Sequence, residues 1–360
     1  MYDISDIQNI PPFSLGREQK ELFLSKHLRD LTLYHYQQCP EYRRILDAWP
    51  FDVNVDVSYK NLPFLPVRLF KEYELKSVDE QYVVKQMNSS GTTGQQVSKI
   101  FLDKETATNQ TKILTKIVSD FIGSKRLPMI ILDTRAVLKD RNLFSARGAG
   151  ILGYSIFGSD KIYALDEEMC IDFESLDAFL EKHSGEDIFL FGFTFMVWQH
   201  FYKELVKSRK LLDLSKGILI HGGGWKKLVD EAVDNTTFKA RLKDVCNLTK
   251  IYNFYGMVEQ VGTIYMECEF GHLHAPIFSD VIIRNPKDFS EVNIGEEGLI
   301  EVVSILPKSY PGHALLTEDS GIILGEDNCP CGRKGRYFSV TGRIKSAEIR
   351  GCSDTYATKY

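Results

Sequence analysis

The middle of the chain alternates between strand-like and helix-like segments, and this alternation narrows the fold more than any other feature. Short apolar runs predict buried strands at 129–132, 188–192, 217–221 and 250–255. The apolar spacing of the intervening segments predicts helices at 176–183, 195–207 and 226–246. Strands that alternate with helices across short loops pack as a parallel sheet between helical layers. We therefore predict an α/β fold.

The pattern changes after Cys268. Strand-like runs without a helical pattern between them occur at 280–284, 298–306 and 321–324. Glycine, proline and charged turns separate these runs, which is typical of a small antiparallel barrel or sheet packed on an α/β body. Nearer the N-terminus, helices are predicted at 19–37 and from a cap at Asp103 through Phe121.

Length and charge exclude some classes of protein. With 360 residues, 43% of them hydrophobic, the chain is long enough for two or three packed units. Its formal net charge of -5 gives no reason to expect nucleic acid or an anionic membrane as a partner. The N-terminus lacks the basic start and apolar run of a signal peptide, and no apolar run reaches the length of a membrane span. We therefore expect a cytoplasmic protein.

A run of hydroxyl side chains and glycines lies between two strand-like segments, 81–87 and 97–102. It consists of Ser89, Ser90, Gly91, Thr92, Thr93 and Gly94, and the basic residue Lys99 follows it. Backbone N–H groups and hydroxyls in such a hairpin loop can hold a phosphate. No Gly-Lys-Ser/Thr tripeptide follows Gly94, so the run is not a phosphate loop that opens a helix. By itself it also fits a flexible turn.

Two short motifs come directly after predicted strands. Gly222-Gly223-Gly224 follows the strand at 217–221, and Tyr255, Gly256 and Glu259 end or follow the next strand. Open α/β sheets bind ligands at the carboxyl ends of their strands. Glycine there lets a flat group approach the backbone, tyrosine can stack on a base, and glutamate can bind Mg²⁺ beside phosphates. Each motif by itself also fits a tight turn or a surface group.

Two charged motifs lie nearer the C-terminus. Thr317-Glu318-Asp319 offers a carboxylate, that of Asp319, to accept hydrogen bonds from ribose hydroxyls. Gly342-Arg343-Ile344-Lys345 supplies two cations. Taken singly, each of these motifs is more typical of a solvated surface.

The order of these motifs resembles the ANL superfamily of adenylate-forming enzymes, which use ATP to activate carboxylates as acyl-AMP. Within it, residues 221–227 (HGGGWKK) and Arg350-Gly351-Cys352 look like the acyl-protein synthetase family, the LuxE-type component of fatty acid reductase. The resemblance covers residues 15 to 355. It implies an ANL-type adenylation domain at 1–342, with two α/β layered subdomains and a small β-barrel, the β-rich part being at about 268–340. Residues 343–360 would form a short hinge and tail that carries Cys352.

The resemblance also implies a role for each motif. Ser89 to Gly94, with Lys99 nearby, would wrap the β- and γ-phosphates of ATP. Gly222 to Gly224 would line the adenine pocket, with Tyr255 stacked on the ring and Gly256 allowing close approach. The remaining implied roles are Mg²⁺ binding by Glu259, ribose binding by Asp319, and a contact to ribose or phosphate at the hinge by Arg343. Mg²⁺ and oriented donors would neutralise the α-phosphate while an anionic carboxylate attacks it.

The chain departs from the superfamily pattern at its C-terminal end. Typical members continue beyond the Gly-Arg motif as a mobile lid that carries an essential lysine. Only residues 344–360 follow Arg343 here, so we expect a truncated lid domain. Lys345 or Lys99 would have to replace the missing lysine. Members of the LuxE type share this truncation.

The resemblance assigns Cys352 a covalent role. In the LuxE-type family a cysteine near the C-terminus accepts the acyl group from acyl-AMP as a thioester. Cys352 has the expected position, and the neighbouring Arg350 would favour its reactive thiolate. The alternative for Cys352 is an idle exposed thiol. Three other cysteines, Cys39, Cys170 and Cys246, lie in apolar or helical surroundings and are expected in the core.

Five further residues include the ligand types of a closed structural zinc site: Cys268, His272, His274, Cys329 and Cys331. Phenylacetate-CoA-ligase-like relatives have a similar Cys/His pair followed by Cys-x-Cys-Gly-Arg, which favours bound Zn²⁺. The alternative is a loop with reduced thiols. A separate aromatic stretch, 189–198, would suit either the wall of an acyl pocket or a core strand joined to a buried helix.

Together these features predict an ATP-dependent acyl-protein synthetase with ATP and Mg²⁺ as cofactors. A carboxylic acid, expected to be a fatty acid, would become acyl-AMP and then a thioester on Cys352, for delivery to a partner of the acyl-CoA-reductase type. Lys99, Glu259 and Cys352 are the expected catalytic residues. Two alternatives stay open: an acyl- or aryl-CoA ligase of the phenylacetate-CoA-ligase type, and a non-catalytic scaffold that keeps the nucleotide fold.

Overall fold

The computed structural model describes residues 9–49, 51–52, 57–89, 96–139 and 146–343. The chain folds as two compact units. Unit 1 contains the described parts of 1–89, 96–118 and 256–343, and unit 2 contains those of 119–255. Five residues of the hydroxyl-rich run, Ser90 to Gly94, and the cysteine expected to carry the acyl group, Cys352, lie outside the described residues.

Unit 2 is built on a parallel sheet with the strand order β5-β4-β6-β7-β8. Its strands are β4 (Leu127–Thr134), β5 (Gly158–Leu165), β6 (Ile188–Phe193), β7 (Gly217–Gly222) and β8 (Lys250–Tyr255). Every residue of the central strands β6 and β7 is buried, as expected for strands covered on both faces. The predicted parallel α/β arrangement is thereby confirmed.

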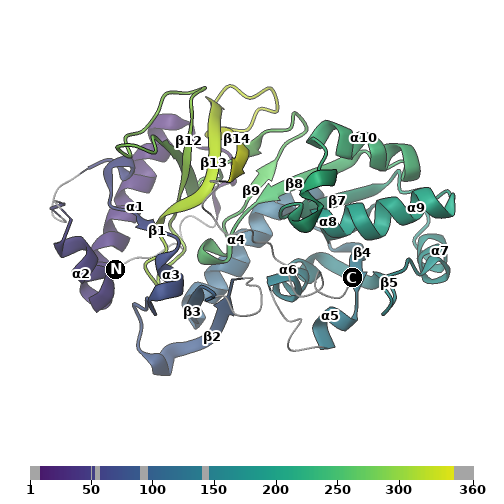
Figure 1. Cartoon of the computed structure of the whole chain (residues 1–360), viewed down its shortest axis with the longest axis horizontal. Coiled ribbons are helices and arrows are strands. Elements are labelled where there is room, and N and C mark those ends of the chain that lie inside the picture. The colour runs from purple at the N-terminus through teal and green to yellow at the C-terminus, as the bar shows by residue number, and fades with distance from the viewer. Residues whose placement is uncertain (1–8, 50, 53–56, 90–95, 140–145, 344–360) are drawn as a thin grey trace. The chain divides into compact units, whose positions relative to one another are not determined.

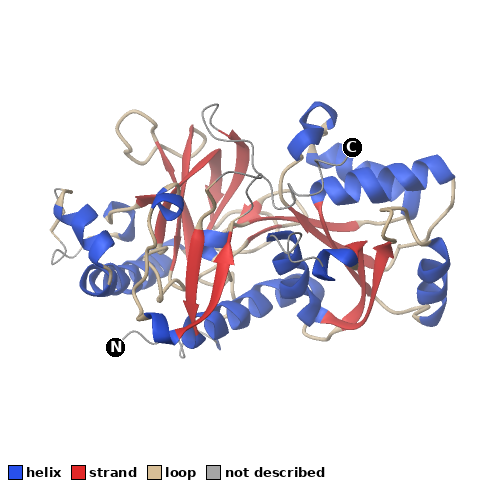
Figure 2. Ribbon diagram, turned by 60° about the horizontal axis from the view of Figure 1, so that its bottom comes forward, coloured by secondary structure: helices blue, strands red, loops and turns tan. Residues whose placement is uncertain are grey.

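Helices flank this sheet, with α9 and α10 on one side of its strands and α5 and α6 on the other (Figure 1, Figure 2). The helices of unit 2 are α5 (Ala136–Lys139), α6 (Ala146–Tyr154), η4 (Ser155–Phe157), α7 (Phe173–Lys182), α8 (Thr194–Met196), α9 (Lys203–Ser208), η6 (Lys226–Glu231) and α10 (Asn235–Cys246). A π-helical segment, η5 (Val197–Tyr202), joins α8 to α9, so the helix predicted at 195–207 is present with one widened stretch.

Unit 1 contains an antiparallel sheet with the strand order β11-β12-β13-β14-β10-β9. Its strands are β9 (Tyr265–Glu267), β10 (Leu273–His274), β11 (Ser279–Arg284), β12 (Glu297–Ser304), β13 (Ala314–Glu326) and β14 (Arg336–Arg343), with β1 (Leu65–Pro66) parallel to β13. Among the described strands β11 pairs with β12 alone, apart from an isolated bridge between Arg284 and Glu291. The described strands therefore form an open sheet, which is one of the two forms expected from the sequence, a barrel being the other.

The remaining elements of unit 1 are helical apart from one hairpin. The helices are α1 (Arg17–Gln38), α2 (Pro40–Asp47), η2 (Tyr59–Asn61), α3 (Leu69–Glu72), η3 (Glu80–Tyr82), α4 (Lys104–Ile122) and η7 (Val258–Gln260), and the boundary between the units falls within α4. The hairpin pairs β2 (Val83–Asn88) with β3 (Lys99–Asp103). As predicted, Asp103 caps α4, because its Oδ1 accepts a hydrogen bond from the Thr106 N–H at 2.7 Å.

Two sequence-based expectations about unit 2 are wrong. The single helix expected at 226–246 is two helices, η6 and α10, because the Asp234 carboxylate accepts from the Thr237 N–H at 2.8 Å and begins a new helix there. Cys170 is exposed, whereas Cys39 and Cys246 are buried as expected.

Among the described residues, no helix has the length and apolarity that crossing a bilayer requires.

Candidate functional site

Glu259, the residue expected to bind Mg²⁺, lies in the short helix η7 and is only 5% exposed. Burial raises the pKa of its carboxyl above the ordinary value, the neighbouring Ser98 hydroxyl partly opposes that effect, and the charge of Arg343 opposes it to a smaller extent. A carboxylate withdrawn from water is unfavourable unless a cation or hydrogen-bond donors compensate it. Ser98 and Arg343 provide part of this compensation, and a bound cation would provide more.

The turn that presents Glu259 is held by residues that the sequence motifs did not indicate. Gln260 Nε2 donates to the carbonyl oxygens of Val302, at 3.1 Å, and Gly312, at 2.9 Å. Gly262 has φ +91°, and a Cβ there would lie 2.6 Å from Gln110 Cα on α4. Only glycine fits this position, so the backbone after Glu259 is fixed against α4.

Asp319 and Arg343 occupy facing positions of β13 and β14. Arg343 Nε lies 3.6 Å from Asp319 Oδ1, and Arg343 Nη2 lies 3.3 Å from Glu318 Oε2. The structure thus brings together two residues that the sequence assigned to one nucleotide. The charge of Glu318 raises the pKa of Glu259 and the charge of Arg343 lowers it, so these groups share one electrostatic neighbourhood within unit 1.

The ends of the hydroxyl-rich run are closed by the β2–β3 hairpin. Ser89 Oγ accepts from the Ser98 N–H at 2.8 Å, and the Ser89 N–H donates to the Ser98 carbonyl oxygen at 3.0 Å. Lys99 Nζ lies 2.9 Å from Glu74 Oε1 in an exposed ion pair. The predicted hairpin is confirmed, but Lys99 is directed to Glu74 in this structure. Its contact to phosphate stays a prediction.

In unit 2 the three glycines of the triplet differ in their surroundings. A Cβ on the buried Gly222 would lie 2.5 Å from the Phe254 ring, so this position is glycine because Phe254 packs on it. Gly223 has φ +79°, which favours glycine. Gly224 is exposed, and no described heavy atom lies within 4 Å of where its Cβ would be. Open space for a ligand is therefore found at Gly224 and not at Gly222.

Tyr255 is half-buried at the end of β8, next to the end of β7. The parallel register pairs Gly222 with Phe254, so the glycine triplet and Tyr255 follow adjacent strand ends in unit 2, as predicted. Beside them, His221 Nδ1 lies 3.0 Å from Thr194 Oγ1, and the His221 ring stacks on Phe238. Burial lowers the pKa of His221 to about 3, so the imidazole is neutral at physiological pH.

The aromatic stretch is core where it forms β6. All six residues of this strand are buried, and Phe191 stacks on Tyr154 with ring centroids 4.1 Å apart. Gly150 of α6 allows close packing on Phe193 of the same strand, because a Cβ there would lie 2.9 Å from the Phe193 ring. The core interpretation therefore holds for this strand, and Met196, Val197 and Trp198 in the helical segment after it are buried as well. An acyl pocket in this stretch stays a prediction.

Four of the five expected zinc ligands converge in unit 1. One ligand atom from each of Cys268, His274, Cys329 and Cys331 lies within 4.8 Å of the others. His272 is outside this group of four, and its Nδ1 lies 3.2 Å from Cys329 Sγ. Burial lowers the pKa of His274 to about 3 and raises the pKa of the Cys329 thiol to about 12. We call these four residues the Cys₃His cluster.

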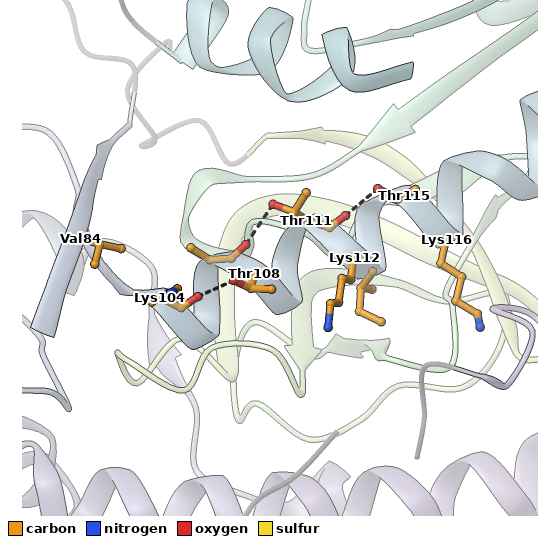
Figure 3. A pocket seen from close by; sticks show the side chains of 9 residues that line it. Val84, Lys104, Thr108, Thr111, Lys112, Thr115 and Lys116 are labelled. Carbon is orange, nitrogen blue, oxygen red and sulfur yellow. Dashed lines mark hydrogen bonds between the residues drawn. The ribbon is translucent and has the colours of Figure 1, made fainter. Parts of the chain in front are cut away.

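A surface hollow of about 710 Å³ lies along α4 (Figure 3). Of the sequence-predicted site residues that the structure describes, none lines it. Its threonines donate their hydroxyls to the preceding helical turn: Thr108 to the Lys104 carbonyl at 2.7 Å, Thr111 to that of Ala107 at 3.0 Å, and Thr115 to that of Thr111 at 2.8 Å (Figure 3). These internal bonds use the hydroxyl donors, so the hollow is a weaker candidate than the motifs above.

Solved structures share this fold. The chain aligns with a crystal structure of 2-hydroxyisobutyryl-CoA ligase in complex with 2-HIB-AMP at a TM-score of 0.72 and 15% identity. The alignment covers 93% of this chain and 70% of that one. An open conformation of the same ligase gives the same TM-score over 97% of this chain and 83% of that one. The fold, with its mixed α/β sheet, is that of adenylate-forming ligases.

Relatives with known names are ligases as well. The long-chain-fatty-acid–luciferin-component ligase of Aliivibrio fischeri is 25% identical over 350 residues, which is 93% of this chain and 88% of that protein. The protein of the same name from Vibrio harveyi is 24% identical over 344 residues, 94% of this chain and 88% of its own length. A family model described as acyl-protein synthetase, LuxE, matches residues 3–360. Because that match spans nearly the whole chain, this protein belongs to the LuxE family of acyl-protein synthetases and is an enzyme.

Proposed function

We propose that the protein activates a fatty acid with ATP and then carries the acyl group on its own Cys352. In the first step a carboxylate oxygen attacks the α-phosphorus of ATP, and the bond to pyrophosphate breaks. In the second step the Cys352 thiolate attacks the acyl carbon, and AMP leaves. The thioester would then be delivered to a partner of the acyl-CoA-reductase type.

The names of the relatives and the fold support acid activation. The Aliivibrio fischeri and Vibrio harveyi proteins are named long-chain-fatty-acid ligases, and the structure of 2-hydroxyisobutyryl-CoA ligase contains 2-HIB-AMP. A fatty acid is therefore the substrate class to test first. The cytoplasm, where ATP is available, is the expected compartment.

The observation that carries the proposal is the group of charges around Glu259 in unit 1. A buried carboxylate for Mg²⁺, the Asp319 carboxylate for ribose hydroxyls and the Arg343 guanidinium for ribose or phosphate belong to one electrostatic neighbourhood. Mg²⁺ would neutralise the phosphates, because a negatively charged carboxylate must approach them. In unit 2, Gly224 and Tyr255 would contact adenine at the strand ends, with Gly222, Gly223 and Gly256 shaping the backbone there.

The remaining assignments follow the family pattern. Ser89 to Gly94 and Lys99 would bind the β- and γ-phosphates, and Ser89 anchors one end of that run. Residues 1–342 would form the adenylation domain, with a β-rich subdomain at about 268–340 that corresponds to β9 through β14. Residues 343–360 would act as a hinge and tail that brings Cys352 to the acyl-AMP.

The proposal is tested by separating its two steps. We expect fatty-acid-dependent exchange of pyrophosphate into ATP in both the unmodified enzyme and Cys352→Ser. Labelled fatty acid should become bound to the unmodified enzyme, in a form released by hydroxylamine, and should not bind to Cys352→Ser. Cys170→Ser is the matched control, because it removes an exposed thiol in unit 2. This variant should still become labelled. Label retained by Cys352→Ser would refute the thioester.

An acyl- or aryl-CoA ligase is the second candidate, because the structural similarity is to a CoA ligase. Incubation with ATP, acid and CoA should then give acyl-CoA in amounts that exceed the enzyme. A non-catalytic scaffold is the third candidate. It predicts no pyrophosphate exchange and no increase in melting temperature with MgATP. A ligand bound at 100 times its Kd would instead raise the free energy of unfolding by about 2.7 kcal/mol.

A further inference from the structure

We propose that the Cys₃His cluster binds one Zn²⁺ as a closed structural site, independent of the proposed reaction. Cys268 Sγ lies 3.9 Å from Cys329 Sγ, and Cys331 Sγ lies 3.3 Å from His274 Nε2. Tetrahedral Zn²⁺, with Zn–S of about 2.3 Å and Zn–N of about 2.0 Å, places two sulfurs about 3.8 Å apart and a sulfur and nitrogen about 3.6 Å apart. These two pairs thus already have nearly the spacing of zinc ligands, and all four ligand atoms lie within 4.8 Å of one another.

The backbone around the cluster forms two equivalent turns. The Gly271 N–H donates to the Cys268 carbonyl at 3.0 Å, and the Gly332 N–H donates to the Cys329 carbonyl at 3.0 Å. Both glycines have positive φ, +79° and +81°. Each turn therefore begins at a ligating cysteine and closes at a glycine three residues later. The two turns come from segments that are far apart in the chain, so their shared form indicates a shared ligand.

Burial favours a metal over free thiols. Cys268 and His274 are completely buried, and Cys329 is 5% exposed. Thiols are weak hydrogen-bonding groups, so gathering three of them around His274 gives little stabilisation without a metal. Sulfur and imidazole ligands in a set of four are typical of Zn²⁺ and fill its tetrahedral shell. No position is left for water or substrate, so the site is structural.

His272 has a different role from His274. Its Nδ1 lies 3.2 Å from Cys329 Sγ, and its ring stacks on Tyr337 with centroids 4.8 Å apart. It is only partly buried and lies outside the group of four ligands. We assign His272 as a hydrogen-bond donor to the Cys329 thiolate. Such a partner orients a ligand and strengthens the site without binding the metal.

The metal would join two loops of one sheet. Cys268 and His274 belong to the β9–β10 hairpin, and Cys329 and Cys331 belong to the loop between β13 and β14. An ion pair between Glu269 and Arg333 links the same two turns at 3.3 Å. The far end of the β13–β14 pair carries Asp319 and Arg343. Zn²⁺ would therefore fix the closed end of the hairpin whose open end carries the proposed nucleotide ligands.

Metal analysis of the full chain, purified without a metal-affinity step, tests the proposal directly. We expect one Zn²⁺ per chain, lost in His274→Ala and Cys331→Ser. His272→Ala is the matched control: it should keep the metal, but with affinity for Zn²⁺ lowered by about 10-fold to 100-fold. Cys170→Ser should be unchanged. Retention by His274→Ala with loss in His272→Ala would overturn the ligand assignment.

Cobalt substitution covers the case in which a variant fails to fold. The unmodified chain loaded with Co²⁺ should show the intense visible bands of a tetrahedral site and the near-ultraviolet band of cobalt–thiolate charge transfer. Removal of the metal by chelator should lower the melting temperature, and Zn²⁺ should restore it. A metal-free unmodified chain that has a Cys268–Cys329 disulfide, or that takes up no Co²⁺ after reduction, would overturn the proposal. None of these measurements needs ATP, so failure of the zinc site and failure of acid activation are distinguishable.

Discussion

Arg343 lies opposite Asp319 in the register of β13 and β14, with its Nε 3.6 Å from Asp319 Oδ1. The same guanidinium also contacts Glu318 through Nη2. Two neighbouring carboxylates therefore share one cation, but they differ in what they are proposed to bind. Asp319 is assigned to ribose hydroxyls, whereas Glu318 has only the contact to Arg343 in the proposal. This difference gives a direct comparison.

Asp319→Asn should weaken ATP binding. The variant keeps the size of the side chain but removes the charge that would accept two ribose hydroxyl bonds. A hydrogen bond to a charged group contributes about 1.5–3 kcal/mol, so the KM for ATP in pyrophosphate exchange should rise by about 10-fold or more. Glu318→Gln is the control, and its KM should stay within about threefold of the original, because partly exposed ion pairs contribute little. Equal effects of the two substitutions would contradict the ribose assignment.

The raised pKa of Glu259 predicts a pH dependence of Mg²⁺ use. Only the deprotonated carboxylate binds Mg²⁺, and burial raises the pKa of this carboxyl. As pH falls toward that pKa, the protonated fraction grows and the apparent affinity for Mg²⁺ should decrease. The measurement is the Mg²⁺ concentration for half-maximal pyrophosphate exchange between pH 5 and pH 8.

ATP itself also titrates between pH 5 and pH 8, so this effect must be separated from that of Glu259. Asp319→Asn serves as the reference for the pH series, because it retains Glu259 and should show the same pH dependence as the unmodified enzyme. Glu259→Gln should need more Mg²⁺ than the unmodified enzyme at pH 8, and that difference should narrow as pH falls. A constant difference across the series would mean that Glu259 does not titrate in contact with Mg²⁺.

Gly262→Ala should destabilise unit 1 through a steric clash. Gly262 has φ +91°, and an added Cβ would lie 2.6 Å from Gln110 Cα. Gly295 has φ +90°, but no described heavy atom lies within 4 Å of its Cβ position. Gly295→Ala should therefore lower the free energy of unfolding by about 1–2 kcal/mol, from backbone strain alone. Gly262→Ala should lower it by about 1–3 kcal/mol more, from overpacking. Urea denaturation measures both, and equal losses would rule out the clash.

His183 should make unit 2 more stable at low pH. Its Nε2 lies 3.0 Å from Asp160 and its Nδ1 lies 2.9 Å from Glu186, and the hydrogen bond to Asp160 is the main cause of its raised pKa. A raised folded-state pKa gives stability that is complete below the unfolded-state value of about 6.5 and is lost as pH rises through the folded-state value. His183→Gln should therefore lower the melting temperature more at pH 5.5 than at pH 9, by a difference on the order of 1 °C.

Lys182→Gln is the matched control for this prediction. Lys182 also contacts Asp160, at 2.8 Å, but a lysine does not change charge between pH 5.5 and pH 9. Its substitution should lower the melting temperature equally at both pH values. If His183→Gln behaves in the same way, the imidazole is not protonated in that contact.

Local patterns predicted many elements of this fold. The β2–β3 hairpin, the Asp103 cap of α4 and the central strands β6 and β7 all agree with the sequence, because each depends on neighbouring residues or on a simple apolar run. The strand β5 was not predicted. Only some of its residues are buried and it carries Asp160 and Lys161, so it lacks the apolar signal of the strands beside it. The strand β14 was also missed, because its second half, 340–343, is exposed and mostly polar.

In the candidate site, too, local patterns predicted some features and missed others. The motifs indicated which chemical groups to look for, but not which of them meet. Glu259 is supported by Gln260, Gly262 and Gly312, which carry no recognisable nucleotide signature. Similarly, two histidines were equivalent candidates in the zinc motif. Packing alone decides that His274 joins the three cysteines and that His272 stacks on Tyr337 beside them.

The order of residues defined the strand and helix segments and the kinds of side chain available for chemistry, since apolar periodicity and capping act over a few positions. Long-range pairing decided the rest. Arg343 reaches Asp319 because two strands align in one register, and Cys268 reaches Cys329 across 61 positions because two loops close on each other. Such contacts depend on how whole elements pack, and no short stretch of the chain contains that information.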